Sequence, residues 1–403
     1  MSGTRLAPVV NDRILATYQA HNYKHQIIAM GGDDSASCEL AVDPTEAFDI
    51  FGAYLGNRVQ TIVNNPSAPI FEGYINRINL EIRGFKFSVS LDTLGNRVMV
   101  SYFNKVSAPN SKVSAEVLNQ DSIDIYGSKM LTQDLGIEYL TTDTRHNVQR
   151  DLLLAKHADP YEQMTVTPTG NASNYSLKLE IKGFYHTLEW DTFEVGVATS
   201  QVSSIVFNYL WYVLVSNATG YNSSRFTSNG TGVFYNTEDF TFFNANATYN
   251  TSTEKRGGQS HLDFIRQHVE PGDGVNDWVF GITRTDPNLG YRRAYYRQAN
   301  TETKYYTNIF KDRRVYSATG ELLDPWTITP DANISILDIP SFNTPLNAQI
   351  PVSYVEKINY DGETGQVTWA SKEDLTLSGQ YQLGKVNKTE GASFGRDARR
   401  SYY

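Results

Sequence analysis

The stretch that decides the fold is residues 70–103, IFEGYINRINLEIRGFKFSVSLDTLGNRVMVSYF, in which apolar and polar residues alternate over most of its length. Alternation with a period of two is typical of strands that bury one face. Gly84 and the step Leu94–Asn96 indicate turns between such strands. The positions expected on the buried face are Phe71, Gly73, Ile75, Ile78, Leu80, Ile82, Phe85, Phe87, Leu91, Val98, Val100 and Tyr102. The stretch therefore predicts a β-meander of three or four strands.

The composition predicts a folded protein of two or three domains. The chain has 403 residues, of which 40% are hydrophobic and 20% charged, so a core can form and disorder is not expected. The 26 tyrosines suit half-buried strands and protein interfaces. Cys38 is the one cysteine of the chain, and we expect it to be a small buried hydrophobic residue.

The net charge of −9 argues against a surface that grips nucleic acid by neutralising its phosphates. It is compatible with an acidic or neutral channel along which a polyanion slides. We expect no targeting segment, because charges are spread through the first residues. The most apolar run, residues 205–215, is too short to span a bilayer as a helix, and we expect a buried helix or strand there.

Helical periodicity and capping residues predict a few helices. The clearest spans about 144–158, capped by Asp143 or Thr144, with Val148, Leu152 and Ala155 on one face. Further helices are expected at about 200–214, at 260–270 with Ser260 as its cap, and after Asp43, where Pro44 suits a first turn. The remaining pattern is one of strands, so the predicted class is mainly β (α+β), with a few packed helices.

Several segments carry weaker signals. Residues 1–30 resemble an extended arm, GGDDSAS at 31–37 a flexible loop, and residues 104–135 a loop with one short strand at 123–126. Strands are expected at 164–166 and 176–190, and hairpins at 277–298 and around the turn Asp361-Gly362. The Asn- and Thr-rich stretch 217–260 is expected to be a surface insertion that folding does not need.

The predicted division of the chain is an N-terminal arm with first strands (1–65), a first β domain (66–142), a helix with linking strands (143–200), a helical and loop insertion (201–276), a C-terminal β domain (277–383) and a flexible tail (384–403).

The histidines and acidic residues do not form a convincing catalytic or metal-binding set. His21 and His25 have a spacing that could offer two metal ligands on a helix, but this segment is not helical in pattern, and we expect both to face solvent. His157 near Asp159 fits a cation at a helix C-terminus. His186 with Glu189 beside Trp190 could form part of a sugar site, but no second carboxylate can be assigned.

Two motif matches near the end of the chain are expected to be coincidental. GASFG at 391–395 fits a nucleophile elbow but has no downstream histidine, and GQYQLGKV at 379–386 lacks the Ser or Thr of a P-loop. A basic and aromatic cluster, Arg292, Arg293 and Arg297 with Tyr291, Tyr295 and Tyr296, is predicted to be an intersubunit face first and a nucleic-acid contact second, as are Arg313 and Arg314. We thus predict no catalytic, cofactor-binding or metal-binding residues.

Four landmarks, taken in order over residues 65–370, resemble tail-hub (tail-tip or baseplate) proteins of tailed bacteriophages. The landmarks are the strands F-x-G-x-I (71–75), G-x-x-x-S (84–88) and N-R-V-x-V-x-Y (96–102); RDLLLAKH (150–157) followed by LEIKGFYHTLEW (179–190); WVFGI (278–282) with AYYR (294–297); and DPWTITP (324–330) ahead of Val355–Ile358. Each motif alone is weak, and their order and spacing carry the resemblance.

The resemblance implies a structural virion protein without enzymatic activity. It implies two barrel-like β domains per subunit, the first a β-barrel at 66–142, with residues 143–200 linking to the second. These domains would stack around an axis, with a trimer favoured over a hexamer. The implied partners are a tail tube protein and a tip, spike or fibre protein, with DNA passing through the lumen. Localisation in the phage tail, assembled in the host cytoplasm, is implied as well.

Two other functions stay open at the level of the sequence. One is a distal-tail adaptor or a receptor-facing tail protein. The other is a β-rich protein that binds or hydrolyses carbohydrate, which requires a concave site with paired carboxylates. A ring assembly would favour the hub, and a stable monomer would favour the carbohydrate function.

Overall fold

The computed structural model describes part of the chain, and all structural statements below concern that part. The described residues are 7–10, 13–14, 19–62, 69–104, 110–139, 144–167, 175–190, 260–270, 278–286, 291–298, 303–307, 315–317, 322–323, 333–336, 353–363 and 366–370.

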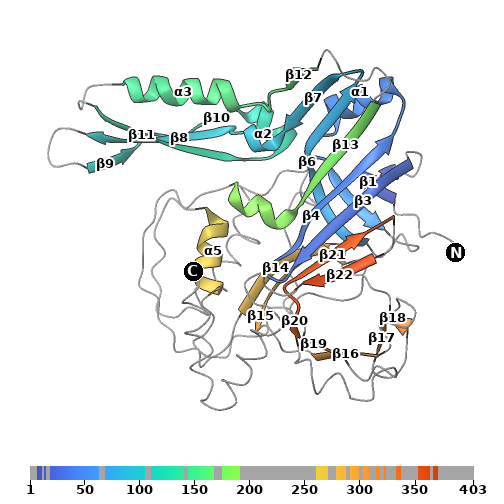
Figure 1. The fold of residues 1–403 in the computed structure, drawn as a ribbon. Helices are drawn as coiled ribbons and strands as arrows, with labels where there is room; N and C mark the ends of the chain where they lie inside the picture. Colours follow the sequence, from blue (N-terminus) through green and yellow to red (C-terminus); the bar gives the residue numbers. More distant parts are fainter. Residues whose placement is uncertain are drawn as a thin grey trace, which may run out of the picture.

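The described chain is mainly β, as predicted, and its strands form three sheets (Figure 1). The largest sheet has 13 strands, in the order β2-β1-β5-β6-β13-β4-β3-β21-β22, with β7 and β12 joined to β6 and with β14 and β15 joined to β4. Its strands are β1 (Ala7–Val10), β2 (Arg13–Ile14), β3 (Gln19–Ile28), β4 (Gly31–Ala41), β5 (Arg58–Ile62), β6 (Pro69–Ile82), β7 (Phe85–Ser90), β12 (Gln163–Val166), β13 (Tyr175–Gly183), β14 (Trp278–Asp286), β15 (Tyr291–Gln298), β21 (Lys357–Asp361) and β22 (Gln366–Ala370).

A four-stranded sheet with a helix projects from one end of the large sheet (Figure 1), and we call this unit the arm. Its strands are β8 (Arg97–Asn104), β9 (Asn110–Val113), β10 (Val117–Leu118) and β11 (Met130–Tyr139), and its helices are α2 (Gln120–Tyr126) and α3 (Arg145–His157). A third sheet contains β16 (Thr303–Thr307), β17 (Val315–Ser317), β18 (Leu322–Leu323), β19 (Asn333–Ile336) and β20 (Ser353–Tyr354). The other helices are α1 (Pro44–Ala53), α5 (His261–Val269) and the short 3-10 helices η2 (Leu91–Thr93) and η3 (Phe184–Glu189).

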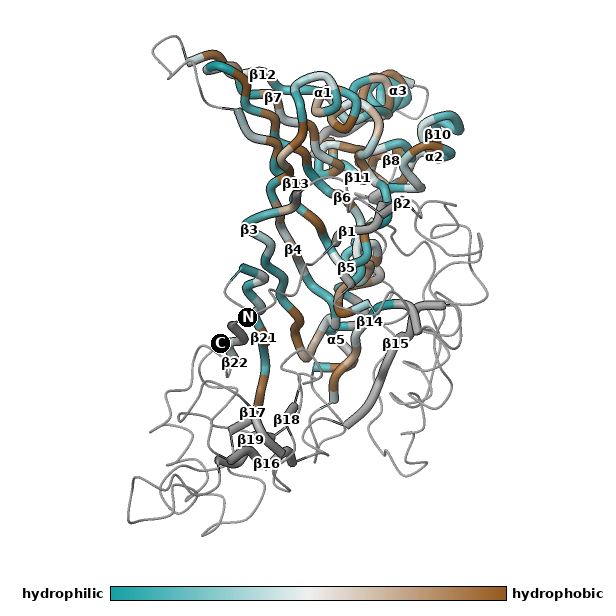
Figure 2. Tube along the Cα trace, turned by 90° about the vertical axis from the view of Figure 1, so that its right-hand side faces the viewer, coloured by the Kyte–Doolittle hydropathy of each residue, from teal (hydrophilic) through white to brown (hydrophobic). Residues whose placement is uncertain are grey.

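Strand β6 pairs with three other strands of the large sheet, and its two halves have different partners along one edge. Its first half pairs with β5, from Arg58 opposite Tyr74, and its second half forms the predicted hairpin with β7, from Ile82 opposite Phe85. Its other edge pairs with β13 through most of its length. Hydrophobic and hydrophilic residues alternate along much of these strands (Figure 2), but only the second half of β6 has one buried face, since residues 70–76 are all buried.

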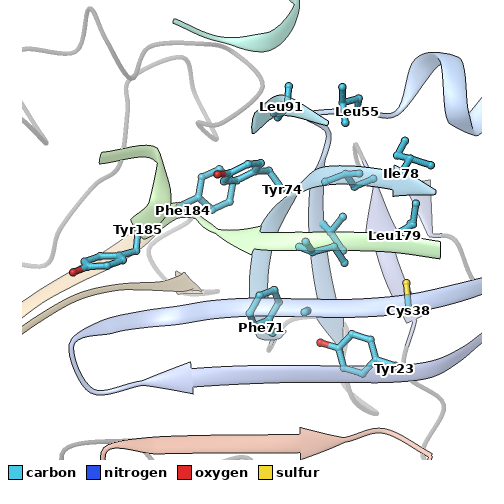
Figure 3. Packing of buried hydrophobic residues seen from close by; sticks show 14 of the residues in the cluster. Tyr23, Cys38, Leu55, Phe71, Tyr74, Ile78, Leu91, Leu179, Phe184 and Tyr185 are labelled. Carbon is cyan, nitrogen blue, oxygen red and sulfur yellow. The ribbon is translucent and has the colours of Figure 1, made fainter. Parts of the chain in front are cut away.

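Buried residues of β6 form the centre of the core. Tyr74, Ile75, Ile78 and Leu80 are fully buried, the adjacent Tyr74 and Ile75 on opposite faces of the strand, and the Tyr74 ring packs against Phe184 at a centroid distance of 5.8 Å (Figure 3). Cys38 of β4 is buried in the same cluster, which confirms its predicted place. Burial of this kind is the main source of folding free energy.

The arm is fixed to the large sheet by backbone and side-chain contacts. The Met130 amide donates to the Trp190 carbonyl at 2.6 Å, and the Gly95 amide donates to the His157 carbonyl at 2.7 Å. Lys129 Nζ donates to the Leu91 carbonyl and lies 5.7 Å from the centre of the Trp190 ring. These contacts join the arm to η2 and η3, so the arm has a defined position.

The structure differs from the sequence-based expectations at several points. Strand β8 pairs with β9, β10 and β11, so the expected meander is a β6–β7 hairpin followed by a strand of the arm. Residues 31–37 are not a flexible loop but the start of β4. Residues 19–28 form β3 rather than part of an extended N-terminal segment. The short strand expected at 123–126 lies in α2, and much of the expected loop before residue 135 is β9 and β11.

Other expectations are confirmed. Helices begin after Asp43, Thr144 and Ser260 as predicted, and Asp43 and Ser260 accept hydrogen bonds from backbone amides of the first turn. The strand at 164–166 and the hairpins β14–β15 and β21–β22 are present. The second expected strand ends at Gly183 and continues as η3.

The closure of two barrels and the domain boundaries stay predictions. The helix at 200–214, the insertion 217–260 and the tail lie outside the described residues. No helix in the described ranges combines the length and the apolar character that crossing a membrane requires.

Candidate functional site

The strands of the large sheet approach one another most closely where β4 begins and β13 ends. Gly32 has a φ of 82°, and a Cβ at this position would overlap the backbone of Ile282 in β14. A Cβ at Gly183 would overlap the carbonyl of Asp33. Glycine is therefore required at both positions, and their contacts draw β4, β13 and β14 together around a cluster of charged side chains.

Asp33 lies at the centre of this cluster and is 1% exposed. Its Oδ2 accepts a hydrogen bond from the backbone amide of Glu72 at 3.0 Å, and its Oδ1 lies 3.7 Å from Nη1 of Arg284. Burial raises the pKa of Asp33 to about 7, and the Arg284 guanidinium opposes that rise. Arg284 also donates to the Ile70 carbonyl at 2.8 Å, so one guanidinium connects β14 to both β4 and β6.

Glu72 forms a second buried ion pair in the same region. Nε of Arg58 lies 2.8 Å from its Oε1, and Nε2 of Gln60 donates to its Oε2 at 3.1 Å. The Glu72 side chain is fully buried, whereas that of Arg58 is 21% exposed. Both carboxylate oxygens thus have partners, which is the condition under which a buried charge is tolerated.

His186 lies between two carboxylates on the other side of β4. Its Nε2 is 2.9 Å from Oδ1 of Asp34, and its Nδ1 is 3.8 Å from Oε1 of Glu189. Burial lowers the pKa of His186, but the hydrogen bonds to Asp34 and Glu189 raise it more, to about 9. A histidine with this pKa carries a positive charge at neutral pH and holds an ion pair rather than acting as a base.

His25 is a buried ring, not a solvent-facing one as expected. It is 4% exposed and lies 5.5 Å from the Phe71 ring and 5.0 Å from the Tyr360 ring, between centroids. Burial lowers its pKa to about 3, with a contribution from Arg284, so His25 is neutral. His21 does face solvent and lies 3.4 Å from Glu39.

The polar face of the large sheet has an open hollow of about 610 Å³ over β3, β4, β13, β21 and β22. Its lining is mostly polar: Lys24, His25, Gln26, Ser35, Ala36, Ser37, Asn76, Lys178, Glu180, Ile181, Lys182, Asn359, Tyr360, Asp361 and Thr368. Lys24 lies 3.3 Å from Asp361, and Lys178 lies 3.7 Å from Glu180. Each carboxylate of the hollow therefore faces a lysine, which differs from the carboxylate pair of a glycoside hydrolase.

The structure places the other candidates of the sequence as follows. Nδ1 of His157 is 3.1 Å from the Thr93 carbonyl, so this histidine joins α3 to η2. Arg292, Arg293 and Arg297 lie on β15, whereas Arg313, Arg314 and the motifs at 379–386 and 391–395 lie outside the described residues. In the described ranges, no group of three or more His, Cys, Asp or Glu side chains is placed to hold a metal ion.

Sequence analysis missed the buried charges Asp33, Glu72 and Arg284. Asp33 was assigned to a loop because Gly31 and Gly32 precede it, and Glu72 is a polar residue at an outward position of an alternating strand. One sequence signal could have indicated that these acidic residues are buried. Asp33 and Glu72 each stand next to a glycine, and glycine within a strand marks a close approach of another strand.

Comparisons with known proteins give the following results. No protein-family model and no curated protein matches the chain. Among solved structures, a type VI secretion system component of E. coli, described as structurally similar to the T4 bacteriophage tail proteins gp27 and gp5, has a TM-score of 0.36 and 8% identity over 91% of this chain and 73% of its own. A tail protein from Neisseria meningitidis has a TM-score of 0.37 and 7% identity over 94% of this chain and 99% of its own.

The Neisseria structure is a tail protein, and the E. coli structure is described as similar to tail proteins. At these TM-scores the likeness carries no argument of its own, and the functional proposal rests on the chain itself.

Proposed function

We propose that this protein is a structural component of a bacteriophage tail, which forms the hub ring between the tail tube and the tip. The observation that carries the proposal is the convergence of the sequence landmarks in the fold. Parts of all four landmarks lie in the large sheet or in η3: β6 and β7, β13 with η3, β14 with β15, and the start of β21. N-R-V-x-V-x-Y lies in β8 and RDLLLAKH in α3, both in the arm, and DPWTITP lies outside the described residues. Landmark segments that lie far apart in the sequence are therefore joined in one sheet.

The charged residues of the site support a structural role. Arg58, Arg284 and His186 each pair with a carboxylate of another element, and none of these pairs is arranged as an acid and base facing an open cavity. Their effect is to fix β4, β5, β6 and β14 relative to one another. We propose that the protein has no hydrolase activity and acts through its shape.

The net charge of the chain supports a channel that does not retain DNA. A hub must let the genome pass through its channel. Contacts of Lys and Arg with DNA phosphates would slow this passage in a salt-dependent way. The net charge of −9 opposes such contacts. We expect negligible binding of duplex DNA at physiological salt, measured by fluorescence anisotropy with the purified full chain.

Electron microscopy of the assembled virion tests the proposal. The expected image shows this chain as a trimeric or hexameric ring at the end of the tail tube, with an acidic or neutral axial channel. Isolated copies on the capsid, or a peripheral fibre, would overturn the proposal.

A further inference from the structure

The β14–β15 hairpin is attached to the large sheet through a short junction with the beginning of β4 (Figure 1). The two strands of the hairpin pair with each other at eight positions. Strand β14 pairs with β4 at only two, Gly281 opposite Gly31 and Ile282 opposite Gly32, whereas β13 pairs with β4 at six. The hairpin is therefore held more firmly within itself than to the sheet.

The contacts beside this junction differ in strength. The Phe280 amide points to Sδ of Met30 at 3.3 Å, and a thioether is a weak hydrogen-bond acceptor. Nη1 of Arg284 donates to the Ile70 carbonyl at 2.8 Å. Phe280 and Ile282 are buried in the core, so apolar burial favours the closed junction, and an open junction is a minor population.

Asp33 follows the paired residues of β4 directly, and its buried carboxylate is only partly compensated. Oδ2 accepts a hydrogen bond from the Glu72 amide at 3.0 Å. Oδ1 has no hydrogen bond of ordinary geometry among the described residues, and Nη1 of Arg284 lies 3.7 Å from it, beyond hydrogen-bonding distance. An ionised carboxylate in the closed junction therefore does not recover all the solvation that it loses on burial.

Charged groups reach Asp33 from β14, β6 and β5. Burial raises the pKa of Asp33 to about 7, the Arg284 guanidinium opposes that rise, and the Glu72 carboxylate adds to it. Nε of Arg58 lies 2.8 Å from Oε1 of Glu72, so the charge of Arg58 compensates Glu72 rather than Asp33. The Asp33 carboxyl therefore changes its charge near neutral pH, with Arg284 as its cationic partner.

The nearby groups of β3 and η3 give Asp33 no further cation. The Tyr23 hydroxyl lies 3.1 Å from Nδ1 of His25. Burial raises the pKa of Tyr23 well above its ordinary value and lowers that of His25 to about 3, so both side chains are neutral. His186 of η3 is charged, but its Nε2 lies 2.9 Å from Oδ1 of Asp34 and pairs with that carboxylate instead.

We propose that the Asp33 carboxyl is a proton-operated latch between β4 and the β14–β15 hairpin. The closed junction tolerates the protonated carboxyl, because a neutral group loses far less on burial than a charged one. The ionised carboxyl gains solvation when β14 moves away from β4, so ionisation raises the population of the open junction. Arg284 is 27% exposed, so the junction lies close to water. The inference goes beyond the proposed function and does not depend on it.

The latch weakens as the pH rises. The pKa of Asp33 is about 7 in the closed junction, and its ordinary value of 3.8 applies to the open one. Protonation of Asp33 therefore stabilises the closed junction fully below pH 3.8, and this stabilisation is lost as the pH rises through 7. Between these limits the ratio of open to closed junction is expected to rise about tenfold per pH unit, and it levels off above pH 7.

Hydrogen–deuterium exchange of the full-length chain, measured by mass spectrometry between pH 5 and pH 8.5, follows the open population. Peptides that cover residues 278–286 report on β14, after correction for the intrinsic pH dependence of amide exchange. Their corrected exchange is expected to rise about tenfold per pH unit up to pH 7. Peptides of β8 in the arm serve as the internal reference and are expected to show no such rise.

Three variants assign the effect to Asp33. Asp33→Asn keeps the size of the side chain and an oxygen for the Glu72 amide but has no charge to lose, so the corrected exchange of β14 is expected to be independent of pH. Glu39→Gln makes the same acid-to-amide change at a partly exposed position of β4 and, as the matched control, is expected to keep the wild-type profile. Arg284→Gln removes the cation that opposes protonation and is expected to move the end of the rise above pH 7.

A rise confined to residues 278–286, abolished by Asp33→Asn and retained by Glu39→Gln, is the expected result. Corrected exchange that is independent of pH in the wild type overturns the proposal, and this measurement needs no variant. A rise that persists in Asp33→Asn, or that is equally large in β8, also overturns it, because another group or global unfolding then causes the effect. None of these outcomes changes the hub proposal, which electron microscopy tests separately.

Discussion

Nε2 of His186 lies 2.9 Å from Oδ1 of Asp34, which joins η3 to the beginning of β4. The contact holds together two segments that sequence analysis had assigned to a strand and to a flexible loop. Asp34 also accepts hydrogen bonds from Gln26 and Ser35, so its carboxylate is fully engaged. Burial raises the pKa of Asp34, but its bonds to His186 lower it more, and the net effect is a lowered pKa.

We expect the His186–Asp34 pair to make stability depend on pH. The pKa of His186 is about 9 in the folded protein and 6.5 as its ordinary value, so its contribution is fully present below pH 6.5 and is lost as the pH rises through 9. His186→Gln is expected to lower the free energy of unfolding by about 2 kcal/mol at pH 7 and by much less at pH 10. Urea unfolding of the two proteins between pH 6 and pH 10 measures the difference.

The matched control is His21→Gln, since His21 is an exposed histidine that lies 3.4 Å from Glu39. An exposed pair contributes about 0–1 kcal/mol, so a small effect is expected. An equal loss for His186→Gln at pH 6 and pH 10 would show that the charge of His186 does not stabilise the fold.

The buried pair Arg58–Glu72 is expected to be strongly coupled. Arg58→Met leaves Glu72 charged and fully buried, and the expected loss is about 3–5 kcal/mol. Arg58→Met/Glu72→Met removes both charges, so it is expected to cost less than the sum of the two single substitutions. A double-mutant cycle by urea unfolding measures the coupling, and additive losses would contradict it.

Charges introduced on the buried faces of β6 and β8 are expected to cause a large loss of folding stability. Ile78 of β6 and Val100 of β8 are both fully buried, so Ile78→Asp or Val100→Asp should cost several kcal/mol, on the order of other unpaired buried charges. Lys178→Asp on the neighbouring strand β13 is the control, because Lys178 is exposed on the polar face. If either core variant melted like the wild type, the assignment of its buried face would be wrong.

The close approach of β13 to β4 predicts a strict requirement at Gly183. Gly183→Ala places a Cβ against the Asp33 carbonyl, and we expect a loss of more than about 3 kcal/mol or insoluble protein. Gly52→Ala is the control, because a Cβ at this position of α1 meets nothing within 4 Å. Alanine should raise stability there by about 0.5–1 kcal/mol. Thermal melting compares the two, and a neutral Gly183→Ala would place β13 farther from β4.

Much of the fold was predictable because it rests on local signals. The alternation of Ile78 and Leu80 identified β6, and the capping residues Asp43 and Ser260 set the starts of α1 and α5. The β21–β22 hairpin followed from the turn at Asp361-Gly362. Each of these signals lies within a few residues of the element that it defines.

The pairings between distant strands and the buried charges were not predictable in this way. Gly31 and Gly32 are typical turn residues, and only the approach of Ile282 from β14 explains why they lie in a strand. Val148 and Leu152 show the converse case: their helical spacing was recognised, but periodicity does not tell whether an apolar face meets the same chain or another one. Burial of Asp33 and Glu72 likewise depends on arginines of other strands, Arg284 of β14 and Arg58 of β5.

The pairing of β3 with β21 has a consequence for how the protein is made. The two strands pair over five positions, and the Asn22 amide reaches the Glu363 side chain 341 positions along the chain. A ribosome must therefore translate almost to residue 361 before β3 acquires its second neighbour. Until then the nascent polypeptide has an unpaired edge on β3, and such an edge favours aggregation. Late closure of the sheet also means that a chain ending before β21 lacks the second neighbour of β3, so every incomplete chain keeps this edge unpaired.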